Sequence, residues 1–240
     1  MTEAPGAPGP TAERARELAA SLAALEQRLD AACTAAGRRR DDVVLVAVTK
    51  TRPASDVVAL RELGVLDVGE NRDQEARVKA AQVPGVRWHF VGGLQTNKAR
   101  SVARYASAVH SVDRAELVQA LSAGAVRAER VLDVLLQVTL DGDPARGGAL
   151  VADVPALAEL AAAAPGLRLA GVMAVAPLDA DPAVAYAALA RVAADLRADH
   201  PQAVAVSAGM SGDLEPAVAA GATHVRVGTA LLGHRPPHAR

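Results

Sequence analysis

Eight short apolar runs, separated by stretches with helical patterning, constrain the fold of this chain more than any other feature. The runs are too short for helices and most are rich in β-branched valine, which favours buried strands. They lie at residues 43–48, 65–68, 86–91, 108–112, 131–138, 167–175, 203–206 and 223–227. Helices are expected between them, at residues 54–63, 73–82, 97–105, 114–127, 150–163, 182–198 and 214–220.

This alternation predicts an α/β protein with a parallel sheet, either an open doubly wound sheet or a closed barrel. The count of eight strands favours the barrel. An open nucleotide-binding sheet would carry G-x-G-x-x-G after its first strand, whereas residues 49–53 read TKTRP, without a glycine. We therefore predict a single (β/α)8 TIM-type barrel.

The ends of the chain differ from this regular part. Residues 1–10 are rich in glycine and proline and predict a flexible N-terminal tail. Residues 11–36 predict an extra N-terminal amphipathic helix, with Leu18, Leu22, Leu25 and Leu29 at helical spacing. No repeat or long linker interrupts the rest, so residues 11–240 are predicted to form one domain.

Charge and cysteine content exclude several classes of function. The chain has 26 Lys and Arg residues against 27 Asp and Glu, a net charge of -1, which argues against nucleic-acid and membrane-surface partners. No apolar run approaches the roughly 20 residues of a membrane span. Cys33 is the single cysteine, so no internal disulfide can form. We expect a cytoplasmic protein.

Aromatic residues make up only 2% of the chain, so the core must be built from Ala, Val and Leu. Too few rings are present for the stacking platforms that bind single-stranded nucleic acid. Trp88 and Phe90 share one face of a strand and are expected in the core, with His89 on the opposite face as a hydrogen-bonded interior histidine.

Lysine is rare in this chain and one lysine stands at a strand end. The three lysines are Lys50, Lys79 and Lys98, while the other cations are Arg, which cannot be deprotonated to act as a nucleophile. Functional groups of a parallel barrel gather where strands end. Lys50 follows the first strand, so we expect it to lose solvation at the barrel mouth and attack a carbonyl; the alternative is a solvated surface lysine. Lys98 is a weaker candidate, and Lys79 is expected at the surface.

The loops after the seventh and eighth strands predict an anion site. Residues 207–211 read SAGMS and residues 228–229 read GT, and both segments lead into short helices. Small residues and hydroxyls at such positions present backbone N–H groups, and the last two loops of a barrel often bind phosphate. Ser211 or Asp213 acting only as a helix cap is the alternative for the first loop. A lysine beside a phosphate site suggests a phosphorylated aldehyde such as pyridoxal 5′-phosphate.

Six ordered motifs between residues 43 and 233 resemble the YggS/PROSC family of pyridoxal phosphate homeostasis proteins. They read VAVTK (46–50), GEN with QE (69–71 and 74–75), WHFVG with LQTNK (88–92 and 94–98), GVMAVAP (171–177), SAGMS (207–211) and VRVGT (225–229). The resemblance implies a barrel like the N-terminal domain of alanine racemase, without that enzyme's second domain. It also implies intracellular homeostasis and delivery of the cofactor rather than established turnover.

The resemblance assigns roles to individual residues. Lys50 would hold pyridoxal 5′-phosphate as a Schiff base, Arg226 would face the pyridine nitrogen and Asn71 would lie near the ring. The candidates for the phosphate are Ser207, Gly209, Ser211, Gly228 and Thr229. Two positions depart from the family pattern: Ala208 replaces a methionine, and Arg72 stands where tyrosine is frequent. Packing around the phosphate loop and the ring is therefore expected to differ.

Three functions remain open: a cofactor carrier, an amino-acid racemase, and an aldolase that uses Lys50 without a cofactor. A racemase needs a second base, usually a tyrosine, yet Tyr105 and Tyr186 fall within predicted helices. An aldolase needs a partner acid, for which Glu70 is the candidate. We favour the carrier, expected to be a monomer, to lack metal and to pass pyridoxal 5′-phosphate to apo-enzymes.

Overall fold

The computed structural model describes residues 6–143 and 146–233, and its centre is the predicted barrel. Eight parallel strands pair in chain order and the ring is closed, which confirms the (β/α)8 fold. The ring closes between the first and last strands, where Val46 is paired with Arg226. The strands are β1 (Val44–Val48), β2 (Asp67–Glu70), β3 (Arg87–Phe90), β4 (Ala108–Val112), β5 (Leu132–Gln137), β6 (Leu167–Met173), β7 (Ala205–Ser207) and β8 (His224–Val227).

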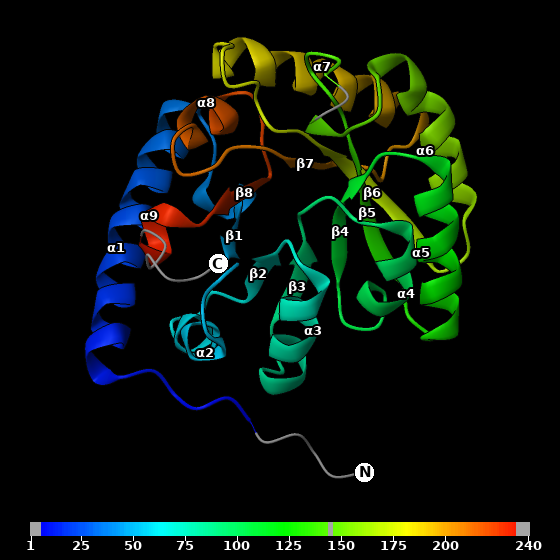
Figure 1. Cartoon of the computed structure of the whole chain (residues 1–240). Helices are drawn as coiled ribbons and strands as arrows, with labels where there is room; N and C mark the ends of the chain where they lie inside the picture. Colours follow the sequence, from blue (N-terminus) through cyan, green and yellow to red (C-terminus); the bar gives the residue numbers. More distant parts are fainter. Residues whose placement is uncertain (1–5, 144–145, 234–240) are drawn as a thin grey trace.

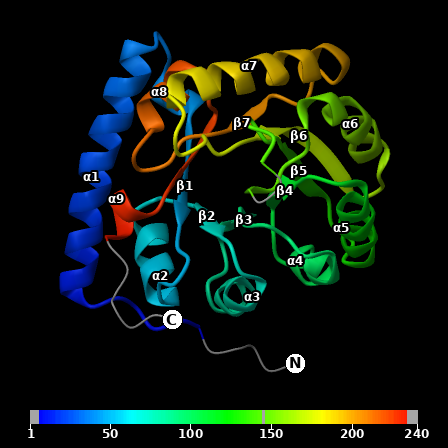
Figure 2. The same ribbon diagram turned by 45° about the horizontal axis from the view of Figure 1, so that its top comes forward.

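Helices surround the ring of strands on its outer side (Figures 1 and 2). They are α1 (Ala12–Ala35), α2 (Ala54–Glu62), α3 (Asp73–Gln82), α4 (Ala99–Val102), α5 (Ala115–Arg127), α6 (Val154–Ala163), α7 (Pro182–Asp199), α8 (Leu214–Ala219) and α9 (Thr229–Leu232), with 3-10 turns η1 (Arg40–Asp42), η2 (Thr96–Lys98) and η4 (Val151–Asp153). Two predicted helices are divided: a 3-10 turn precedes α4 and another precedes α6. Whether such a helix begins with a 3-10 turn depends on local packing, which the spacing of apolar residues in the sequence does not reveal.

The extra N-terminal helix is confirmed as α1. The Thr11 hydroxyl accepts a hydrogen bond from Arg14 N at 3.2 Å and caps the helix. Its apolar face buries Leu18, Leu25 and Leu29. This face packs against α2, α8 and α9. Helix α1 therefore lies along the side of the barrel on which α9 follows the last strand (Figure 1, blue).

The predicted flexible tail overlaps residues 1–5, which lie outside the described residues together with residues 144–145 and 234–240. Within the described part of the tail, Ala7 N donates to the carbonyl of Gln82 at 3.2 Å, which places this segment against the end of α3. Across the described ranges, no helix combines the length and the apolar character needed to cross a membrane.

The interior of the barrel is more polar than the composition suggested. Trp88 and Phe90 are buried in the apolar core, as predicted. Inside the ring, however, the imidazoles of His89, His110 and His224 gather, with ring centroids 5.1 to 6.2 Å apart. Such interiors are usually filled by branched aliphatic side chains. Buried polar groups need hydrogen-bond partners, and these groups find them in the network described below.

Candidate functional site

A cavity of about 380 Å³ lies at the carboxyl ends of the strands and brings together most of the predicted site residues. The predicted residues that line it are Lys50, Asn71, Ser211, Arg226, Gly228 and Thr229, and its other lining residues are Val48, Val91, Gly92, Val175, Met210 and Gly212. Two predicted phosphate residues, Ser207 and Gly209, are buried behind it. Apart from Lys50 and Arg226, the described lining residues carry no ionisable side chain.

Lys50 lies two residues after the end of β1, and the last residue of that strand, Val48, pairs with Gly69 of β2. Its side chain is exposed and its amine makes no hydrogen bond or ion pair within the described residues. The expected loss of solvation is therefore wrong, because the lysine stands at the open mouth of the barrel rather than inside it. An unpartnered amine at the cavity wall can still react with a carbonyl group bound there.

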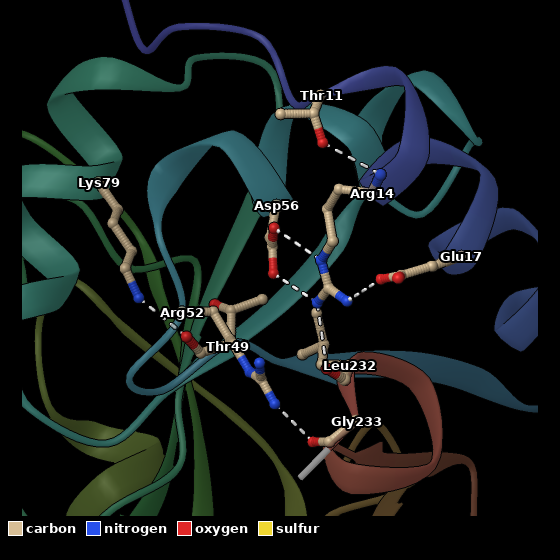
Figure 3. Close-up of polar contacts among 9 residues, drawn as sticks. All are labelled: Thr11, Arg14, Glu17, Thr49, Arg52, Asp56, Lys79, Leu232 and Gly233. Atoms are coloured by element: carbon tan, nitrogen blue, oxygen red, sulfur yellow. Dashed lines mark hydrogen bonds and ion pairs between the residues drawn. The ribbon is translucent and has the colours of Figure 1, made fainter. Parts of the chain in front are cut away.

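Lys79 was expected at the surface, and this is wrong. Only 6% of the residue is exposed, and its Nζ donates to the Thr49 carbonyl at 2.9 Å (Figure 3). Nζ also donates to Glu70 Oε1 at 2.6 Å. Asp73, Ala76 and Lys79 form the buried face of α3, at intervals of three residues. The spacing of these residues is visible in the sequence, but Asp73 and Lys79 are polar, so the sequence did not predict that this face of the helix is buried.

Glu70 is a buried carboxylate just below the mouth. Its Oε1 accepts hydrogen bonds from Lys79 and from the Thr49 hydroxyl, at 2.7 Å from the latter, while its Oε2 has no partner in the described part of the chain. Burial raises the pKa of Glu70, and the neighbouring Lys79 ammonium only partly opposes this. Glu70 does not line the cavity, so it is not placed to exchange protons with a molecule bound there.

Arg226 extends from β8 into the closed end of the cavity and is 5% exposed. Its guanidinium donates to the Ser207 hydroxyl at 2.6 Å and to the Ala174 carbonyl at 2.9 Å. Burial lowers the pKa of Arg226 to about 10, so the group stays charged at neutral pH. The site therefore holds a fixed cation that donates hydrogen bonds and accepts none.

A chain of buried polar groups continues from Ser207 through the barrel interior. Ser207 Oγ lies 2.8 Å from His110 Nδ1, His110 Nε2 lies 2.9 Å from His89 Nδ1, and His89 Nε2 lies 2.9 Å from Asp67 Oδ1. Burial would raise the pKa of Asp67, but hydrogen bonds from His89 and Arg87 outweigh it and lower the pKa to about 2. The Asp67 carboxylate can only accept, so His89 Nε2 donates to it, and at the other end of the chain Ser207 Oγ accepts from the Arg226 guanidinium.

Two of the three interior imidazoles, His110 and His224, are uncharged. Burial lowers the pKa of His110 well below its ordinary value and lowers that of His224 to about 4, so both rings are neutral at pH 7. No motif in the sequence singled out His110, which lies within the predicted strand at residues 108–112. The available signal was that three of the six histidines fall inside predicted strands.

The two loops of the predicted anion site are joined to each other and to α1. Ser211 Oγ accepts a hydrogen bond from Ala230 N at 3.2 Å, which links the loop after β7 to α9. Arg28 of α1 donates to the Ser211 carbonyl at 2.7 Å and pairs with Glu215 of α8. The N-terminal helix thus holds the Ser211 loop from outside the barrel.

Asp213 and Gly209 shape the same loop without lining the cavity. Asp213 accepts hydrogen bonds from Met210 N at 2.6 Å and from the Tyr186 hydroxyl at 2.7 Å. Gly209 has φ +86°, and a Cβ there would lie 2.6 Å from Ala217 Cβ, so only glycine fits. Ala208, which departs from the family pattern, is buried in the core behind the loop.

Asn71 lies between the main cavity and a second one of about 290 Å³, and it lines both. The second cavity is also lined by Arg72 and Lys98, so the weaker lysine candidate is not in the main site. Gly92 permits the close approach of Asn71, because a Cβ at this position would lie 2.6 Å from Asn71 Cβ. Arg72 is exposed at the start of α3, which is the second departure from the family pattern.

Neither tyrosine reaches the main cavity. Tyr186 lies in α7, as predicted, and its hydroxyl is used by Asp213. Tyr105 lies in the turn after α4, and its hydroxyl is buried. Burial raises the pKa of both phenols above their ordinary value.

Comparisons with known proteins identify the family. The family described as "Alanine racemase, N-terminal domain" matches residues 20–236. The pyridoxal phosphate homeostasis protein of Mycobacterium tuberculosis is 45% identical, over 93% of this chain and 95% of that protein. The structure of PipY from Synechococcus elongatus, solved with PLP bound, has a TM-score of 0.77 at 34% identity and covers 90% of this chain and 100% of that one. A protein of unknown function from Bifidobacterium adolescentis has a TM-score of 0.85 at 29% identity, covering 94% and 98%. The chain therefore belongs to the family of pyridoxal phosphate homeostasis proteins, built on the alanine racemase N-terminal domain fold.

Proposed function

We propose that this protein binds pyridoxal 5′-phosphate as a Schiff base with Lys50 and acts in its intracellular homeostasis and delivery. One observation carries the proposal: an unpartnered lysine amine, a buried arginine cation and two hydroxyl-bearing loops line a single cavity. The relatives named for pyridoxal phosphate homeostasis and the PLP-bound structure of PipY support it. We also propose that apo-enzymes are the recipients and that the carrier is a monomeric cytoplasmic protein.

The residues present fit the chemistry of this ligand, which supplies an aldehyde to the site. Lys50, as a neutral amine, would supply the nucleophile for that aldehyde, with one water molecule released as a C=N bond replaces the C=O bond. Arg226 would face the ring nitrogen and, as a group that only donates, would leave that nitrogen unprotonated. A ring held in this state withdraws few electrons, which suits storage rather than Cα chemistry.

The phosphate is assigned to the loops after β7 and β8. Ser211, Gly228 and Thr229 all line the cavity, and the hydrogen bond between Ser211 and Ala230 joins the two loops. Gly209 is kept as the residue that permits the loop's shape. Ser207 is left out, because its hydroxyl is already shared by Arg226 and His110.

The two alternative functions have less support from the site. Racemisation needs a base on each face of the ring, and of the described lining residues only Lys50 can serve as one. A cofactor-free aldolase needs an acid beside the lysine, but Glu70 is bound by Thr49 and Lys79 outside the cavity. Among its described lining residues, the cavity therefore lacks the second base that a racemase needs and the acid that an aldolase needs.

Borohydride reduction tests the proposal. The purified protein mixed with pyridoxal 5′-phosphate should absorb in the visible range, and reduction followed by peptide mass spectrometry should place the adduct on Lys50. Lys50→Ala should lose the adduct but still bind pyridoxamine 5′-phosphate, which has no aldehyde. An adduct on Lys98 or Lys79 with Lys50 unmodified would contradict the assignment.

A further inference from the structure

We propose that Lys79 is a positioning residue that holds the Thr49–Arg52 loop so that Lys50 faces the cavity. The proposal rests on the function proposed above, since it concerns the reaction of Lys50 with an aldehyde. It assigns a task to a buried lysine that touches neither the cavity nor its ligand. Burying an ammonium group is costly, so its retention beside the reactive loop calls for a specific role.

The Lys79 ammonium bonds to the residue before Lys50. Nζ donates to the carbonyl of Thr49 at 2.9 Å (Figure 3). The same carbonyl accepts from Arg52 N at 3.0 Å. The Thr49 hydroxyl donates to Glu70 Oε1, which also accepts from Lys79. Thr49 is thus bonded at its carbonyl and its side chain to one buried ion pair, and little freedom remains for the peptide that leads to Lys50.

The other side of Lys50 is held from the same helix. Thr51 has φ +64°, a left-handed conformation that is uncommon for a β-branched residue and needs support from its surroundings. Thr51 N donates to Glu75 Oε2 at 2.9 Å. Glu75 lies one helical turn before Lys79, and their charged groups are 3.8 Å apart. The ammonium therefore sits between two carboxylates that anchor the residues on either side of Lys50.

A second role for Lys79 has to be separated from this one, namely compensation of the buried Glu70 charge. Lys79→Met alone would leave Glu70 without a counter-charge, and a loss of stability would then be expected whatever the loop does. Glu70→Gln removes that charge while Lys79 can still donate to Thr49. Adding Lys79→Met to Glu70→Gln then removes the contact to Thr49 without creating an uncompensated Glu70.

The test compares Glu70→Gln with Glu70→Gln/Lys79→Met. We expect the double variant to form the Lys50 adduct at least about tenfold more slowly on mixing with pyridoxal 5′-phosphate, because small displacements of a reacting group lower its rate steeply. Its affinity for pyridoxamine 5′-phosphate should stay within about twofold, since the phosphate and ring contacts are intact. Arg77→Met, on the exposed side of α3, is the matched control and should leave both quantities unchanged.

Two failures are distinguishable. Equal rates of adduct formation in Glu70→Gln and the double variant would overturn the positioning role of Lys79 and leave the proposed function standing. Absence of any Lys50 adduct in the wild-type protein would instead overturn the proposed function. A double variant that loses pyridoxamine 5′-phosphate affinity as much as adduct rate would also contradict the inference, because the defect would then extend beyond the loop.

Discussion

The guanidinium of Arg226 donates to the hydroxyl of Ser207 at 2.6 Å, and through this bond the cavity is connected to Asp67 at the opposite end of the barrel. Among the described residues, no carboxylate bonds directly to Arg226, whereas Asp67 is paired with Arg87 and has a pKa of about 2. The two charged groups are joined only through Ser207, His110 and His89. Arg226 therefore carries its charge in the barrel without an adjacent ion pair.

Removing the Ser207 hydroxyl should affect stability and leave phosphate binding almost unchanged. Ser207→Ala leaves one Arg226 donor and His110 Nδ1 without a partner, which should cost about 1–3 kcal/mol of the free energy of unfolding. Urea denaturation measures this cost, and calorimetric titration with pyridoxamine 5′-phosphate measures the affinity. A large loss of pyridoxamine 5′-phosphate affinity with an unchanged free energy of unfolding would instead show that Ser207 binds the phosphate.

The hydroxyls of Ser211 and Thr229 should behave in the opposite way. Each hydrogen bond to a charged phosphate is worth about 1.5–3 kcal/mol, so Ser211→Ala and Thr229→Ala should each weaken pyridoxamine 5′-phosphate binding by about tenfold or more. Loss of a helix cap would instead cost about 1 kcal/mol of stability. Ser122→Ala, which removes a hydroxyl bonded to Pro165 on the outer side, serves as the control. Reduced stability with unchanged affinity would favour the capping interpretation.

Arg28 should support ligand binding from the N-terminal helix. Arg28→Met removes the hydrogen bond to the Ser211 carbonyl together with the ion pair to Glu215, whereas Glu215→Gln removes only the charge of the partner. A partly exposed ion pair contributes at most about 1 kcal/mol to stability. We expect Arg28→Met to weaken pyridoxamine 5′-phosphate binding and Glu215→Gln to leave it near the wild-type value. Equal affinities in the two variants would show that the Ser211 loop does not need this anchor.

The buried histidines should make the protein less stable in mild acid. The pKa of His224 is lowered by burial to about 4, so below pH 6.5 the unfolded chain binds protons that the folded chain does not. The free energy of unfolding should therefore fall as the pH decreases from 6.5 to 4, by up to about 3 kcal/mol from His224, and should change little from this cause above pH 6.5. His110 acts in the same direction.

Urea denaturation at several pH values checks this dependence. His224→Gln should flatten the decline between pH 6.5 and 4, because one of the two groups that take up protons on unfolding is gone. Asp67 acts in a lower window, since its stabilising contribution is complete above about pH 4 and is lost as the pH falls toward 2. An unchanged slope in His224→Gln would contradict the assignment of this ring as neutral and buried.

Catalytic turnover should stay low. Lys50 is the only described lining residue that can act as a base, so alanine should perturb the absorption spectrum of the loaded protein without rapid exchange of its Cα proton. Deuterium exchange followed by NMR should remain far below the roughly 1–1000 per second of dedicated enzymes. Racemisation of alanine at an ordinary enzymatic rate, lost in Lys50→Ala, would reveal a second base.

The barrel could be predicted from the sequence because its signal is repeated along the chain. Helix α3 was predicted at its observed bounds, and every strand lies within a few residues of its predicted position. The side-chain directions were harder. Ser207 was expected in the cavity, but its side chain is buried in the barrel interior. Successive side chains of a strand face opposite sides, and the sequence does not reveal which residue at the strand end faces the cavity. The prediction that Lys79 is exposed was wrong because the sequence of the helix does not show that the Glu70 carboxylate of β2 lies beside it.

The pairing of β1 with β8 has a consequence for the growing polypeptide. Lys50 is synthesised well before Arg226 and Thr229, so a nascent chain that already contains the lysine still lacks these two residues of the cavity. A ligand that contacts residues of both β1 and β8 bridges the strand pair at which the ring closes, and its binding free energy then opposes reopening of the ring. Ligand binding would thus require that both strands have been synthesised and paired, and would stabilise their pairing.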